Sequence, residues 1–295
     1  MEKVLYHEFP QLRRPLLIAG FEGWPNAAEV SSFSLQYLID QLKAKPLASI
    51  PLGHFYDLSA RRPIGIIVEG RLRELVLPRN DFYYAHLAPD RDLLLFSGVE
   101  PHFQWEAFSQ LFLEVAQRFE AQPIITLGGT YDSIPHTFPT VVSAVFNSEA
   151  LEEELLEAGL QFTEYTGPIS IHTFLLEMAR KRGIKALSLW GHAPQYLQAR
   201  NVKVVHGLLQ KLNRLIRAEI DLSKLANASH YFDQQVQHLV SQDPKLAEMI
   251  QRLEEAHVKT GRASVPPKKE EPKEDNVIYI QAFLKRQEEG EKNEN

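Results

Sequence analysis

Residues 15–42 read PLLIAGFEGWPNAAEVSSFSLQYLIDQL and predict a strand, a glycine-containing turn and a helix in direct succession. Residues 16–19 are a short apolar run, typical of a strand buried on both faces. Apolar residues then recur at helical spacing, and Asn26 followed by Glu29 resembles a capping box that opens the helix. The loop at residues 20–25 therefore follows the carboxyl end of a strand, where open α/β sheets usually bind their ligands.

The same alternation continues along the chain and predicts an α/β fold. Residues 92–97, 124–127 and 186–191 are further apolar runs of strand length, and helical patterns lie between them. We expect a three-layer α/β sandwich with a mixed central sheet. A glycine closes each predicted parallel strand, so their loops are expected to meet at one rim of the sheet: Gly20, Gly98, Gly128 and Gly191. Short β-rich segments predict antiparallel strands or hairpins inserted in this sheet: residues 47–52, 64–69, 72–77 and 81–87.

The pattern changes at Val202, beyond which only helical periodicity remains. We divide the chain into an α/β core domain at residues 1–220, a C-terminal helical hairpin at 221–258, a disordered linker at 259–275 and a tail at 276–295. The linker is charged and contains prolines, so it cannot bury enough apolar surface to fold. The tail carries an apolar group predicted to dock on a partner or a neighbouring subunit: Ile278, Tyr279, Ile280, Phe283 and Leu284.

Composition excludes several classes of partner and chemistry. The chain has 295 residues, 44% of them hydrophobic, which supports a sizeable core. Its net charge of −6 and lack of a basic block argue against binding to nucleic acid or to an anionic membrane. The absence of cysteine excludes disulfides, thiolate metal sites and a cysteine nucleophile. No signal-peptide core or membrane-length apolar run occurs, which predicts a cytoplasmic protein.

Candidate ligand-binding residues gather in the loops of the predicted rim: Gly20, Glu22, Gly23, Asn26, Glu100, Gly128, Gly129 and Asp132. The glycine spacing matches neither a phosphate-binding P-loop nor a dinucleotide-binding turn. Helix amides after Asn26 offer an anion site, but Glu22 and Glu29 place negative charge there, which favours a structural turn. The carboxylates of Glu22, Glu100 and Asp132 either form an acid–base pair or cap neighbouring helices.

Other reactive groups lack the spacing that their chemistry needs. His102, His136, His172 and His192 match no zinc-binding motif, so structural histidines are favoured and no metal is predicted. Ser97 and Ser133 lie outside any nucleophile elbow, which leaves a Ser–His–Asp triad without support. No cofactor is predicted. The aromatic side chains of Phe103, Trp105 and Tyr131 lie in the same loops and are suited to an interface.

The ordered motifs of the rim resemble a known family. The segments IAGFEGWPNAAE at residues 18–29, SGVEPHFQW at 97–105, LGGTYDSIPHTFPT at 127–140 and GPISI at 167–171 are similar to those of the proteasome assembly chaperone two family, in its bacterial branch. The resemblance covers about residues 15–216 and implies a phosphorylase/hydrolase-like three-layer fold, homo-oligomerisation and a part in protein assembly. It brings no established catalytic set.

The chain departs from this family at its C-terminus. Archaeal relatives dock on proteasome rings through a terminal hydrophobic–Tyr–any motif, whereas the similar string Ile278–Tyr279–Ile280 lies inside the tail. The free carboxylate of the family motif is therefore missing beside this tyrosine. The resemblance does not carry over that route of docking.

Two functions remain open on the sequence. The first is a non-catalytic, oligomeric assembly chaperone or scaffold that binds itself and either proteasome subunits or another protein complex. The second is an enzyme that binds or hydrolyses a small, nucleoside-like molecule at the rim, a hypothesis based on analogy of fold. Two carboxylates facing each other in a closed pocket would favour the enzyme, and an open apolar rim would favour the scaffold.

Overall fold

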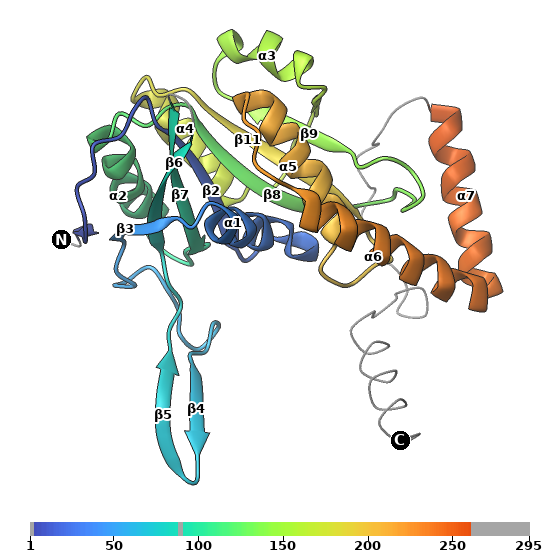
Figure 1. Cartoon of the computed structure of the whole chain (residues 1–295), viewed down its shortest axis with the longest axis horizontal. Helices are drawn as coiled ribbons and strands as arrows, with labels where there is room; N and C mark the ends of the chain where they lie inside the picture. The colour runs from blue at the N-terminus through green and yellow to red at the C-terminus, as the bar shows by residue number, and fades with distance from the viewer. Residues whose placement is uncertain (1–2, 88–90, 261–295) are drawn as a thin grey trace.

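A computed structural model describes residues 3–87 and 91–260, and within them one mixed sheet of nine strands organises the chain (Figure 1). The strand order is β1-β3-β6-β7-β2-β8-β11-β9-β10. The strands of this sheet are β1 Leu5–Tyr6, β2 Leu16–Glu22, β3 Lys45–Ser49, β6 Asp81–Leu87, β7 Arg91–Val99, β8 Ile124–Asp132, β9 Val142–Phe146, β10 Gln161–Phe162 and β11 Ala186–Pro194. The helices are α1 Val30–Gln41, α2 Trp105–Arg118, α3 Glu152–Glu157, α4 Ile171–Lys181, α5 Val202–Ile216, α6 Ser223–Gln242 and α7 Pro244–Thr260, with short 3-10 turns η1 Ala27–Glu29 and η2 Glu149–Leu151. The predicted α/β sandwich with a mixed sheet and a C-terminal pair of helices is confirmed.

The two faces of the sheet are covered by different helices because successive side chains of a strand point to opposite faces. Leu16 and Ile18 of β2 pack into a core with α1, α3 and α5. Leu17, Ala19 and Phe21 of the same strand pack into a second core with α2 and α4. The uncharged part of β2, residues 16–21, is thus buried on both sides, as its sequence predicts.

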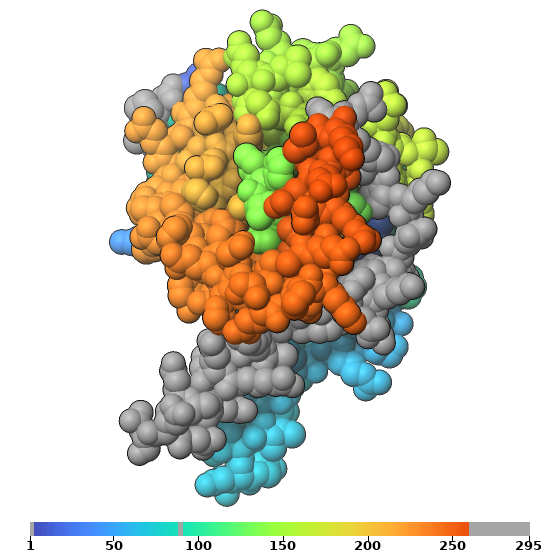
Figure 2. Space-filling model, turned by 90° about the vertical axis from the view of Figure 1, so that its right-hand side faces the viewer, coloured from blue at the N-terminus to red at the C-terminus, as the bar shows by residue number. Residues whose placement is uncertain are grey.

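The last two helices, α6 and α7, meet at a steep angle and pack beside the segment that follows β11 (Figures 1 and 2). A third apolar cluster joins Val236 and Val240 of α6 and Ile250 of α7 to Tyr196 and Leu197, which follow β11. The carboxylate of Asp243 accepts hydrogen bonds from the Lys245 and Leu246 amides at 2.9 and 3.2 Å, so α7 begins with the side-chain cap that the Asp–Pro pair predicts.

Two expectations about strands differ from the structure. Strands β4 (Ile64–Val68) and β5 (Arg71–Val76) are not inserted in the main sheet but form a separate hairpin that projects away from it (Figure 1). Their sequence specifies strands, yet the hairpin has its own turn and needs no neighbour in the sheet to pair. The parallel strands also run on past the glycines expected to close them: β2 continues through Gly20 to Glu22, β7 through Gly98 to Val99, β8 through Gly128 to Asp132 and β11 through Gly191 to Pro194. These residues keep pairing with the neighbouring strand.

The C-terminal predictions fall mainly outside the described residues. Helix α7 continues to Thr260, two residues into the expected linker at 259–275. The rest of that linker and the tail, including Ile278, Tyr279, Ile280, Phe283 and Leu284, lie outside the described part of the chain. Within residues 3–87 and 91–260, no helix is long and apolar enough to cross a membrane.

Candidate functional site

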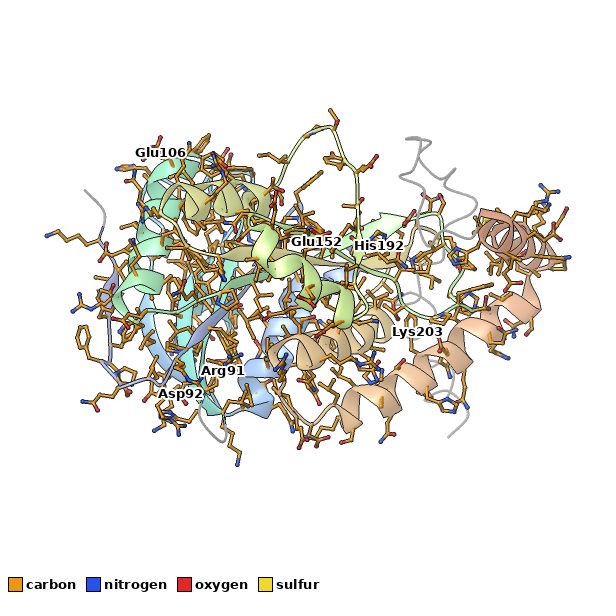
Figure 3. All side chains as sticks on the ribbon, turned by 90° about the horizontal axis from the view of Figure 1, so that it is seen from above. Arg91, Asp92, Glu106, Glu152, His192 and Lys203 are labelled. Carbon is orange, nitrogen blue, oxygen red and sulfur yellow. The ribbon has the colours of Figure 1, made fainter. Side chains whose placement is uncertain are left out.

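The rim lies at the edge where neighbouring parallel strands end. Strands β7, β2, β8 and β11 pair in parallel, so their carboxyl ends reach the same edge of the sheet. Figure 3 shows Asp92, at the start of β7, well apart from His192, near the end of β11. The expected convergence of the post-strand loops on one rim is therefore found.

An open cavity of about 450 Å³ occupies the part of the rim beyond β2 and β7. This volume is within the usual range for small-molecule pockets. Charged and aromatic side chains line it together, which makes its wall mixed in character. The residues that define the rim cavity are Gly23, Trp24, Arg61, Glu100, His102 and Trp105.

Glu100 is held at the wall of this cavity by backbone amides. Its carboxylate accepts hydrogen bonds from the Trp24 amide at 3.1 Å and from the Ile171 amide at 2.9 Å. Ile171 is the first residue of α4, so the carboxylate satisfies an amide that a helix start leaves unpaired. Burial raises the pKa of Glu100, and the two amide hydrogen bonds oppose that shift. The side chain thus ties the loops after β2 and β7 to the start of α4.

Glu22 points to a different partner. Its carboxylate forms an ion pair with the guanidinium of Arg61, which comes from the segment between β3 and β4. The Glu22 carbonyl accepts the Glu100 amide at 2.8 Å, so the two residues are joined through the backbone. Their carboxylates are each engaged separately, by a guanidinium and by amides.

Asp132 belongs to a buried hydrogen-bonded chain that spans three strands. Its carboxylate lies 2.8 Å from Nδ1 of His192, and Nε2 of His192 lies 2.9 Å from Oγ of Ser143. The three side chains come from β8, β11 and β9 and are almost fully buried. The order of contacts matches a Ser–His–Asp triad. Ser143 lies within a paired strand, opposite Trp190 of β11, and not on an exposed turn.

The candidate glycines of the rim serve close packing. A side chain at Gly20 would meet Leu35 of α1, and one at Gly128 would meet the ring of Trp190. At Gly129, a Cβ atom would lie 2.3 Å from the carbonyl oxygen of Ala27. The Gly129 amide also donates to the Pro25 carbonyl at 2.8 Å. These contacts hold the chain before α1 against β8.

Asn26 caps the first helix by a different contact from the one expected. Its Oδ1 accepts the Ser32 amide of α1 at 3.0 Å, and Glu29 pairs with Arg200 instead of closing a capping box. The difference arises because residues 27–29 form the 3-10 turn η1, and α1 begins only at Val30. With the Ser32 amide occupied, an anion site at this helix start has one donor fewer.

The aromatic side chains of the rim divide into packed and exposed groups. Trp105 stacks edge-on against Phe174 and donates its indole N–H to the Pro101 carbonyl at 2.7 Å. The Tyr131 hydroxyl accepts the Ala28 amide at 3.2 Å. In contrast, Trp24 is 60% exposed and Phe103 is 52% exposed. Trp24 thus leaves aromatic surface open at the rim cavity, and Phe103 follows the cavity-lining His102 in the chain.

The side chains of the rim are better suited to contact with another molecule than to acid–base catalysis. Glu22, Glu100 and Asp132 are bound to three different partners, so each carboxylate is held separately from the other two. Among residues 3–87 and 91–260, no group of three His, Asp or Glu side chains could hold a metal ion. Sequence reasoning missed Arg61 and Ser143. Arg61 reaches Glu22 from the long connection between β3 and β4, and Ser143 reaches His192 because β9 lies beside β11 in the sheet, and no local motif predicts either contact.

Comparisons with known proteins agree with the fold and the motifs. Residues 20–240 match the PAC2 family. A PAC2 family protein of Streptomyces avermitilis is 28% identical, with a TM-score of 0.73, over 80% of this chain and 99% of its own. A proteasome-assembly chaperone homologue of Mycobacterium tuberculosis gives the same identity, TM-score and coverage. No curated protein matches this chain significantly in sequence.

An archaeal protein shares the fold at lower identity. The proteasome activator PbaB of Pyrococcus furiosus is 21% identical, with a TM-score of 0.65, over 81% of this chain and 99% of its own. At this identity the likeness concerns the fold alone. The family resemblance found in the sequence is confirmed.

Proposed function

Because this chain belongs to the PAC2 family, we propose that it acts in the cytoplasm as a non-catalytic, self-associating scaffold that assists the assembly of other proteins. Its proposed partners are further copies of itself and proteasome subunits, in keeping with the Mycobacterium relative, which is described as a proteasome-assembly chaperone homologue. The observation that carries the proposal is the state of the rim, where each candidate carboxylate already has a structural partner.

The proposed partner surface is the edge of the rim cavity. Exposed aromatic side chains and arginine are common centres of binding energy at protein interfaces. Trp24 and Arg61 line this cavity, and Phe103, the neighbour in sequence of the cavity-lining His102, is exposed as Trp24 is. The bond from the Trp24 amide to Glu100 fixes the backbone that carries the indole, so little order has to be gained on binding.

Co-elution with proteasome subunits of the same source tests this proposal. We expect the chain to co-elute with the α-subunits in size-exclusion chromatography. Joint replacement of Trp24 and Phe103 by Ala should weaken binding at least ~10-fold at unchanged melting temperature, because both side chains are exposed. Tyr231→Ala, which removes an exposed aromatic of α6, is the matched control and should bind normally. A wild-type chain that binds neither α- nor β-subunits would contradict the proposal.

A second candidate function is the binding or hydrolysis of a small, nucleoside-like molecule. Two observations favour it: the rim cavity has a suitable volume, and Ser143, His192 and Asp132 are hydrogen-bonded in the order of a triad. Burial of Ser143 opposes it, because a nucleophile must reach its substrate.

Nucleoside binding and serine labelling distinguish the two functions. An enzyme would be stabilised by nucleosides in a thermal-shift assay and would react with a fluorophosphonate probe in a manner abolished by Ser143→Ala. The scaffold predicts neither response. Labelling of wild type but not of the Ser143→Ala variant would make the second function the correct one.

A further inference from the structure

A second open cavity, of about 590 Å³, lies where the last turns of α7 face the loop between β8 and β9. Figure 2 shows α7, in orange-red, beside surface coloured green, which comes from the middle of the chain. The surface exposed in this cavity is mostly apolar, although three charged side chains also line it. We call it the α7 groove, and the described residues that line it are Thr137, Phe138, Glu254, Glu255, Val258 and Lys259.

Contacts between its two walls give the α7 groove a defined shape. The ring of Phe138 lies edge-on to the ring of His257, with 4.8 Å between the ring centres. The hydroxyl of Thr137 donates a hydrogen bond to the carboxylate of Glu254. Val258, in contrast, is 69% exposed and lines the groove. The walls are therefore fixed to each other, while apolar surface between them stays open to a ligand.

A segment of the same chain has the composition that fits this groove. Residues 277–284, which lie outside the described part of the chain, read VIYIQAFL and contain no charged side chain. Lys285 and Arg286 follow them directly. The lining of the groove carries two glutamates against one lysine, and the carbonyl groups at the end of α7 add negative potential. An apolar segment followed by two cations thus matches both the apolar surface and the charge of the groove.

The connection to the groove is short, which favours this segment over a free partner. Helix α7 ends at Thr260, directly after Val258 and Lys259 of the lining, and residues 261–276 lead from there to the apolar segment. A chain of about 16 residues without a fold of its own has an end-to-end distance of roughly 20–24 Å, enough to turn back to the groove. Tethering at this range gives an effective concentration of about 1 mM, so a contact with a dissociation constant of ~0.1 mM would be occupied roughly nine-tenths of the time.

We propose that residues 277–284 bind in the α7 groove of their own chain. The sequence left a partner or a neighbouring subunit as the target of this segment, and the groove offers a target within the same chain. Docking covers the apolar segment and keeps it from other proteins until a competitor displaces it. The inference is independent of the proposed function, because it concerns neither the rim nor the assembly of other proteins.

Photo-crosslinking in the intact chain tests this docking. The chain has no cysteine, so a benzophenone attached to a Gln281→Cys variant labels the segment alone. We expect a product that keeps the 33.7 kDa mass of one chain and joins the labelled peptide to residues 137–138 or 254–259. An equal mixture of unlabelled and nitrogen-15-labelled chains distinguishes crosslinks within a chain from crosslinks between copies.

A substitution in the groove of the same labelled chain tests the site. Val258→Gln removes apolar surface from the lining at an exposed position and keeps a good helix former. The yield of the crosslink should fall at least ~5-fold at unchanged melting temperature. Ala256→Gln, at an exposed position of α7 outside the lining, is the matched control and should keep the yield.

Hydrogen exchange gives a second measurement that needs no label. Joint replacement of Ile280 and Phe283 by Ser should release the segment, so amides of residues 254–259 should exchange at least ~5-fold faster while amides of α1 keep their rates. Crosslinks that map to other parts of the chain, or that join two copies, would overturn the inference. An equal yield in the Val258→Gln variant, or exchange unchanged by the serine replacements, would overturn it as well.

Discussion

At the residue scale, glycines of the rim are explained by how closely the chain before α1 approaches β8. Gly129→Ala should lower the free energy of unfolding by about 1–3 kcal/mol, because the new Cβ would lie 2.3 Å from the backbone oxygen of Ala27. Denaturation in urea measures the change. The substitution is destabilising because a backbone atom cannot move aside as a side chain can.

Gly167→Ala is the matched control for that substitution. Its Cβ would lie 2.6 Å from the hydroxyl of Tyr165, which is the end of an exposed side chain that can move aside by giving up one exposed hydrogen bond to the Pro168 carbonyl. We expect a change within about 0.5 kcal/mol. Equal losses at Gly129 and Gly167 would show that the close approach to Ala27 is not the reason for the glycine.

His172 is expected to make the stability of the folded chain depend on pH. It is buried between Phe21 and Trp190, and burial lowers its pKa to about 3. Below about pH 6.5, His172 binds a proton in the unfolded chain but stays neutral in the folded chain. The free energy of unfolding therefore falls as the pH decreases toward 3. The slope from this group is about 1.4 kcal/mol per pH unit.

Denaturation of His172→Phe at several pH values isolates this group. The variant removes the titration and keeps an aromatic ring, so its stability should fall less steeply than wild type between pH 6 and pH 4. Above about pH 8, where His172 is neutral in both states, the stability difference between the two proteins should be independent of pH. Parallel curves over the whole range would mean that His172 takes up its proton as readily in the folded chain as in the unfolded chain.

At the element scale, the local sequence predicts where strands and helices form better than it predicts which elements pack or pair with one another. The apolar run of β2 and the Asp–Pro start of α7 each predict the observed element. The free arm of β4 and β5 could not be distinguished from inserted strands, because strand propensity does not say what a strand pairs with. The arm differs only in tertiary placement.

The cap of α7 is a test at this scale. Asp243→Ala removes the acceptor of the Lys245 and Leu246 amides and should destabilise the start of α7 by about 1 kcal/mol. Hydrogen exchange of the first-turn amides of α7 should then be about 5-fold faster, while amides of α1 keep their rates. Unchanged exchange in α7 would show that Pro244 and packing alone define the helix start.

At the scale of the whole molecule, the rim could be predicted but its internal contacts could not. Parallel strands place Glu22, Glu100 and Asp132 at one edge, which the order of elements indicates. The partners of these carboxylates come from distant segments of the chain, and no local sequence motif predicts such pairs. They are Arg61, the Ile171 amide and His192. Whether the rim is suited to catalysis or to binding another protein depends on the partners of these three carboxylates.

The rate of proteasome assembly from purified subunits tests the central claim most directly. We predict that this chain accelerates the formation of subunit rings, followed by native mass measurement. A variant with both Glu100→Gln and Ser143→Ala should do so equally if it melts at the wild-type temperature, because neither side chain acts in chemistry. No acceleration by wild type, or its loss in this variant at unchanged melting temperature, would contradict a non-catalytic assembly scaffold.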